Sequence, residues 1–136
     1  MPDPCTYDYA IVRVVPRVER GEFINVGAIV SSDAKGYLAA RFAVDEARLL
    51  GIDPHVDLNA VRTALAAIAA VCAGGAAAGA IGRLSLRERF HWLVAPRSTM
   101  IQTSAVHTGR CDDLADALDH LLARMVRPPT TSGPSP

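Results

Sequence analysis

The chain has 136 residues, half of them hydrophobic, and its 14 basic and 14 acidic residues give a formal net charge of zero. This length is typical of one folded domain, which we expect over residues 1–127. A zero net charge does not support nucleic-acid binding, for which a strong basic excess is typical. The most apolar stretch, around residues 68–72, is soon broken by glycines and is too short for a membrane span of about 20 residues.

Three strands are predicted in the first third of the chain. Residues 7–15 present apolar side chains on both faces, as in a central strand that is covered on each side, and Pro16 ends the run. Residues 23–31 form a second strand, and a loop over residues 33–36 leads to a third at residues 37–42. The short links predict an antiparallel meander.

Helical spacing follows. Residues 45–50 predict a short helix closed by Gly51, and Asp53 with Pro54 provides the N-cap and first residue of a second helix. The apolar stripe of that helix recurs at steps of three and four: Leu58, Val61, Leu65, Ile68 and Cys72. Residues 74–82 are rich in glycine and alanine and predict a mobile loop.

The second half begins with a capping box. Ser85 and Glu88 have its spacing and predict a single helical turn, after which strands are expected at residues 91–95 and 100–106. Asp112 or Asp113 caps a last helix, and residues 128–136 (PPTTSGPSP) are expected to be disordered. The predicted buried face of the last helix is Leu114, Leu118, Leu121, Leu122 and Met125.

These elements give the order βββ-α-α-ββ-α. We therefore expect an α+β fold in which a mostly antiparallel five-stranded sheet packs against amphipathic helices on one face. The first residues, MPDPCTYDY, lack the basic and apolar regions of a signal peptide, so we expect a cytoplasmic protein without membrane contact.

Several kinds of chemistry lack their usual motifs. Cys5, Cys72 and Cys111 do not have the spacing of a zinc site, so no metal is expected. A P-loop, a dinucleotide-binding glycine turn, a nucleophile elbow and an HExxH motif are all missing from the sequence, so no cofactor is expected.

Three residues of the first hairpin do not fit a purely structural strand. Arg13 lies within an otherwise apolar strand face, where it needs either an ion pair, with Glu22 as one candidate, or a bound ligand. Asn25 and Gly27 are poor strand residues. They indicate either a β-bulge in which Asn25 bonds to the backbone, or a ligand that approaches Gly27 closely.

A second polar group surrounds the predicted fifth strand. Residues 81–110 hold five arginines and one acidic residue, Glu88, which predicts a local positive patch. Arginine, hydroxyl and amide groups at Arg97, Ser98 and Gln102 are donors suited to phosphate or carboxylate. The predicted ligand-binding residues are Arg13, Arg17, Asn25, Arg97, Ser98 and Gln102. Whether Arg13 and Arg97 face the same side of the sheet is left open.

The sequence favours a non-catalytic binding or accessory module with an anionic small molecule or a protein as partner. The alternative is an enzyme acting on a phosphate-containing substrate, a nucleotide or nucleic acid, with His107 or Glu22 transferring the proton. That alternative requires His107 or Glu22 within about one water of the Arg97 and Ser98 groups.

Two long stretches carry a family resemblance. YDYAIVRVVPRVERGEFINVGAIV (residues 7–30) and SLRERFHWLVAPRSTMIQTSAVHTG (residues 85–109) resemble the bacterial domain-of-unknown-function family 3037, and the resemblance extends over residues 7–126. It implies no established activity. It does imply an accessory role in which a HipA-type kinase is the partner.

Overall fold

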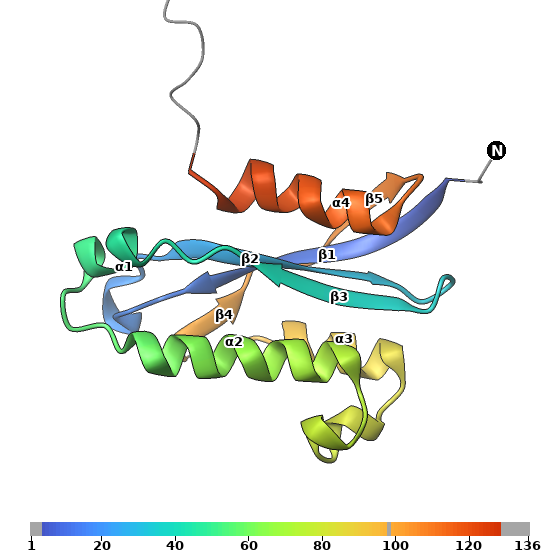
Figure 1. Cartoon of the computed structure of the whole chain (residues 1–136), viewed down its shortest axis with the longest axis horizontal. Coiled ribbons are helices and arrows are strands. Elements are labelled where there is room, and N and C mark those ends of the chain that lie inside the picture. Colours follow the sequence, from blue (N-terminus) through green and yellow to red (C-terminus); the bar gives the residue numbers. More distant parts are fainter. Residues whose placement is uncertain (1–3, 98, 129–136) are drawn as a thin grey trace, which may run out of the picture.

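Strand β1 (Cys5–Val14) lies at the centre of one antiparallel sheet and pairs with three other strands (Figure 1). In this computed structural model, which describes residues 4–97 and 99–128, the strand order is β3-β2-β1-β4. β2 spans Ile24–Ser32 and β3 spans Tyr37–Phe42. β4 (Ile101–Thr103) and β5 (His107–Cys111) follow one another along the other side of β1, since β4 pairs with residues 12–14 and β5 with residues 5–9.

Helices cover both faces of this sheet (Figure 1). α2 (Leu58–Ala73) and α3 (Leu86–Val94) lie on one face, and α1 (Glu46–Ile52) adds Leu49 to the same core. α4 (Leu114–Leu121) and the π-helical turn η4 (Leu122–Val126) lie on the other face. Short 3-10 turns occur at Val18–Arg20, Ala76–Ala78 and Ile81–Arg83.

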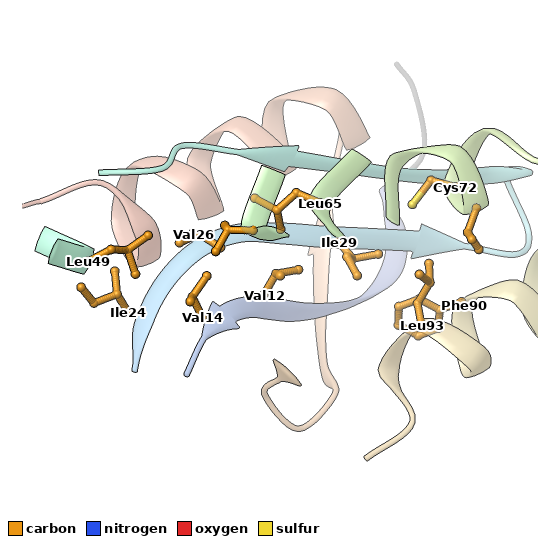
Figure 2. Close-up of a cluster of buried hydrophobic side chains, with 12 residues drawn as sticks. Val12, Val14, Ile24, Val26, Ile29, Leu49, Leu65, Cys72, Phe90 and Leu93 are labelled. Atoms are coloured by element: carbon orange, nitrogen blue, oxygen red, sulfur yellow. The ribbon is translucent and has the colours of Figure 1, made fainter. Parts of the chain in front are cut away.

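The α+β class and the antiparallel five-stranded sheet are confirmed, but the prediction of helices on one face is wrong. Side chains of a strand alternate between faces, and β1 and β2 are apolar on both, so each face needs a cover. Val12, Val14 and Val26 belong to the larger core beneath α2 and α3 (Figure 2). Ile11 and Val30 belong to the core under α4.

The beginning of α2 also differs from the prediction. Asp57 is the N-cap, because its side chain accepts a hydrogen bond from the Ala60 N–H, and Asp53 precedes the helix. Asp53 is buried and accepts a hydrogen bond from the His55 N–H at 2.9 Å. α1 continues past Gly51 to Ile52.

The predicted strand at residues 91–95 is wrong, since these residues belong to α3 and its end. The capping box is formed, with the Glu88 N–H donating to Ser85 Oγ and the Ser85 N–H to Glu88. It opens a helix of nine residues rather than one turn. Phe90 and Leu93, three residues apart, are buried on one helix face.

The predicted strand at residues 100–106 is split. Only Ile101–Thr103 pairs with the end of β1, and a second strand follows at His107–Cys111, which the prediction missed. Glycine in the middle of that strand has a specific use. A Cβ on Gly109 would lie 2.6 Å from the ring of Tyr7 on β1, so the close contact between these strands needs the missing side chain.

The N-cap of the last helix is Asp113, one of the two predicted candidates, and the helix changes from α to π near its end. The Arg127 N–H donates to the Leu122 carbonyl at 2.9 Å, which is a spacing of five residues. The wider turn leaves Val126 only 4% exposed and Met125 44% exposed. Met125 was predicted on the buried face, and Val126 occupies it instead.

Candidate functional site

A cleft of about 180 Å³ lies between α2, α3 and strand β4. Ala64, Ala67 and Ile68 line it from α2, and Trp92 and Leu93 line it from α3. Trp92 is 42% exposed, so a large aromatic ring is accessible at the cleft. An apolar cleft with a few convergent polar groups is the usual form of a small-ligand site.

Two of the sequence-predicted residues, Arg97 and Gln102, line this cleft. The Gln102 side-chain amide donates to the Thr99 carbonyl at 2.9 Å, and the Thr99 hydroxyl donates to the Ile101 carbonyl at 2.9 Å. These two bonds fix the short turn that leads into β4. Ser98, the third residue of the predicted group, lies outside the described residues.

Arg97 is held in place by the end of α3. Its Nη1 donates to the Leu93 carbonyl at 2.9 Å and its Nη2 to the Trp92 carbonyl at 2.6 Å, while the guanidinium carbon lies 4.5 Å from the centre of the Trp92 ring. α3 stops before Pro96, so the carbonyls of its last turn need donors from elsewhere. Arg97 therefore has a structural role, and its Nε–H makes no hydrogen bond within residues 4–97 and 99–128.

Arg13 does not reach this cleft. It lies directly opposite Gln102 and Asn25 in the register of the sheet, on the side covered by α4, and its guanidinium carbon lies 4.0 Å from the Phe23 ring centre. Its Nε is buried and has no hydrogen-bond partner among the described residues. Glu22, the candidate ion-pair partner, instead accepts a 2.5 Å bond from Arg20. Arg13 and Arg97 therefore do not share one cleft.

Asn25 stands next to the predicted β-bulge, which is present. Val12 pairs with Gly27 and Arg13 with Asn25, so Val26 is the extra residue of β2. The Asn25 amide donates to the Met125 carbonyl of η4 at 2.9 Å and thereby connects β2 to the π-helical turn. This is the backbone bond predicted for Asn25.

Gly27 makes room for a neighbouring side chain. A Cβ there would lie 2.3 Å from the Phe42 ring on β3. The glycine therefore serves the pairing of β2 with β3, and no ligand is needed to explain it.

The remaining predicted residues lie elsewhere. The Nε of Arg17 is 3.6 Å from Asp53 Oδ2, so it neutralises the buried carboxylate that precedes α2. His107 is paired with Tyr9 across β5 and β1, and their ring centres are 5.5 Å apart. Neither His107 nor Glu22 is among the described residues that line the cleft with Arg97.

Another pocket, of about 290 Å³ and more polar than the cleft, is lined by Asn25 together with Arg48, Arg124 and Arg127. None of the three arginines forms an ion pair with another described residue. Arg124 lies in the last turn of the α4–η4 helix and Arg127 caps it, so both complement the negative end of the helix dipole. Helix stability accounts for these two arginines, and the cleft at Trp92 is the better candidate site.

The thiols of Cys72 and Cys111 are not poised as nucleophiles. Burial raises the pKa of Cys72 to about 11. Desolvation, followed by the hydrogen bond with Cys5 at 3.6 Å, raises the pKa of Cys111 to about 11. Both thiols are protonated at neutral pH, whereas nucleophilic cysteines are thiolates.

Metal binding and membrane crossing receive no support from the described residues. In the ranges 4–97 and 99–128, no three side chains among histidine, cysteine, aspartate and glutamate are grouped to hold a metal ion. Nor does any helix there have the length and apolar character needed to cross a membrane.

Sequence reasoning found the polar side of the cleft and missed its apolar walls. Ala64, Ala67 and Ile68 fit an amphipathic helix, and only Ile68 was noticed, as a core position. Trp92 was placed on a strand. Once residues 86–94 are helical, an exposed tryptophan five residues before an arginine is the signal that would have located the cleft.

Comparison with known proteins identifies the family without adding an activity. Residues 9–126 match the family described as "Protein of unknown function (DUF3037)". No curated protein and no solved structure matches the chain. The matched range extends from β1 to η4 and includes every residue that lines the cleft. The chain therefore belongs to the DUF3037 family of proteins of unknown function.

Proposed function

We propose that the protein is a non-catalytic binding module whose ligand carries an apolar group and an anionic group. The apolar group fills the cleft between α2, α3 and β4, and the anion binds Arg97. The observation that carries this proposal is the fixed position of Arg97. Because three backbone carbonyls and the Trp92 ring already hold the guanidinium, little side-chain entropy is lost when an anion binds to it.

The size of the cleft limits the apolar group. A dry apolar cavity of about 150 Å³ holds one benzene molecule. At about 180 Å³, the cleft fits one aromatic ring or one branched aliphatic group. We therefore assign the ligand to aryl or branched alkyl compounds with a carboxylate or similar anion within reach of Arg97.

An accessory role toward a protein is compatible with this site, and a HipA-type kinase is the partner to test first. The alternative of an enzyme gains nothing from the geometry. The cleft is lined by no carboxylate or imidazole from the described residues, and proton transfer requires such a group within hydrogen-bond reach.

The test uses hydrocinnamate, a phenyl group with a short carboxylate arm, as probe. Trp92 is the only tryptophan of the chain, so its fluorescence reports binding in the cleft directly. Saturable quenching is expected at millimolar hydrocinnamate and should be weaker with the neutral hydrocinnamyl alcohol. Ala67→Phe fills the cleft and should abolish the response, whereas Ala66→Phe, exposed on the same helix outside the lining, should retain it.

The charge is tested with Arg97→Gln, and Arg87→Gln, an exposed arginine on α3 outside the lining of the cleft, is the control. Arg97→Gln should weaken hydrocinnamate binding and leave binding of the alcohol unchanged. If hydrocinnamate does not change the Trp92 fluorescence of the wild type, or changes it equally in Ala67→Phe and Ala66→Phe, the cleft is not a binding site.

A further inference from the structure

The cleft follows the outer edge of strand β4. Ile101, Gln102 and Thr103 all line it, although neighbouring side chains of a strand point to opposite faces of the sheet. A wall made of three consecutive residues must therefore include the edge of the strand. β4 is the last strand in the order β3-β2-β1-β4, so no described strand pairs with that edge.

The edge offers unpaired backbone groups. The Val15 N–H donates to the Met100 carbonyl at 2.7 Å, and the Ser104 N–H donates to the Ile11 carbonyl at 2.8 Å. Residues 100, 102 and 104 therefore direct their backbone groups toward β1, and the residues between them direct theirs away. The N–H of Ile101 and both backbone groups of Thr103 thus face outward, along the cleft.

We propose that the ligand of this cleft is an extended segment of a partner protein, which adds to β4 as a further strand. This inference rests on the proposed function and names the ligand class for the same site. The unpaired edge supplies main-chain hydrogen bonds, and the cleft beside it accepts one side chain of the added strand. An edge strand next to a side-chain pocket is the arrangement by which folded domains bind extended peptides.

The chemistry of the segment follows from the two ends of the site. Its anchor is an aromatic or branched aliphatic side chain, which fits the volume of about 180 Å³. A carboxylate complements Arg97, whose Nε–H is not used within the described residues. Side chains two residues apart lie on the same face of an extended chain, so the acidic residue is expected two positions from the anchor.

The experiment selects random heptapeptides by display on the full-length protein, with the Ala67→Phe variant for counter-selection. We expect the enriched peptides to contain a large apolar residue and an acidic residue two positions away. Binding of the best peptide is then measured by Trp92 fluorescence. A version N-methylated at the residue that pairs with β4 should bind about tenfold more weakly, which corresponds to one lost backbone hydrogen bond.

The protein side of the same bond is tested with Thr103→Pro. Proline removes an N–H that faces away from β1, so the ladder between β1 and β4 stays intact. This variant should lose peptide binding about tenfold, while its circular dichroism spectrum stays that of the wild type. In the wild-type complex, the amides of Ile101 and Thr103 should exchange with solvent more slowly than in the free protein.

The outcomes separate the two proposals. If hydrocinnamate and peptides both fail to change Trp92 fluorescence, the proposed function itself is refuted. If hydrocinnamate binds but no peptide is enriched, or if N-methylation leaves affinity and amide exchange unchanged, the cleft binds a small molecule and the added strand is refuted. Should Thr103→Pro not fold, the N-methylated peptide decides alone.

Discussion

The π-helical turn at the end of α4 makes a sharp prediction about two adjacent residues. Val126 is 4% exposed, and mutating it to alanine removes two buried carbons, at about 0.8 kcal/mol each. A residual cavity adds a further amount, and the higher helix propensity of alanine offsets about 0.5 kcal/mol. We expect Val126→Ala to lower the free energy of unfolding by about 1.5 kcal/mol. Met125 is 44% exposed, so Met125→Ala should stay within about 0.5 kcal/mol of the wild type.

Chemical denaturation followed by circular dichroism measures both changes, and thermal melting provides a second readout. For a chain of this size, about 1.5 kcal/mol corresponds to a Tm lower by roughly 6 °C. A regular α-helix would bury Met125 and expose Val126 instead. Mutating a buried methionine to alanine costs about 2–5 kcal/mol. If Met125→Ala proves more destabilising than Val126→Ala, the result refutes the π-helical turn and its hydrogen bond from the Arg127 N–H to the Leu122 carbonyl.

Four further predictions concern local features of the fold. Gly27→Ala should destabilise the protein by about 1–3 kcal/mol in denaturant titrations, because its Cβ would lie 2.3 Å from Phe42. Gly51→Ala, in α1 with open space around it, is the matched control and should be neutral or stabilising by up to about 1 kcal/mol. Ser85→Ala should cost about 1 kcal/mol through loss of the N-cap. The capping bonds lower the pKa of Glu88 below its ordinary value of 4.5. The stabilising effect of the Glu88 carboxylate, which Glu88→Gln removes, is therefore present above pH 4.5 and is lost as the pH falls below that value. Cys72, which is buried and has a pKa of about 11, should react with a thiol reagent at pH 8 only at the rate of unfolding. Fast labelling of Cys72 in the native protein would contradict its burial.

The first half of the fold could be predicted because its signals are local. The alternation in residues 7–15 and 37–42 and the apolar stripe from Leu58 to Cys72 each determine their own element. The winding of the last helix could not be predicted in the same way. The π-helical turn accepts a hydrogen bond at its Met125 carbonyl from Asn25, one hundred residues away in sequence. No periodicity within the helix contains that information.

Residues 91–111 show the same limit for strands and helices. Phe90, Trp92 and Val94 favour a strand by propensity, yet the capping box at Ser85 starts a helix and the Arg97 side chain satisfies its last carbonyls. The strand His107–Cys111 has little intrinsic preference for that state. It pairs with residues 5–9 of β1, where the Tyr7 ring lies against Gly109, and a contact between residues so far apart in the sequence is visible only in the folded chain.

Two arginines predicted to bind an anion lie on different sides of the sheet. Arg97 was predicted as an anion-binding residue from its chemistry alone, and Arg13 for the same reason, but the sheet separates them because it has a helical layer on each face. The hydrogen bonds by which Arg97 satisfies the last carbonyls of α3 also hold its guanidinium beside Trp92, in the cleft that β4 lines. Arg13, whose cation rests on Phe23 and whose Nε is buried, has no comparable opening toward a described cleft. For a candidate binding site we therefore weigh a polar residue more heavily when its backbone partners fix it next to an open apolar surface than when only its chemistry suits a ligand.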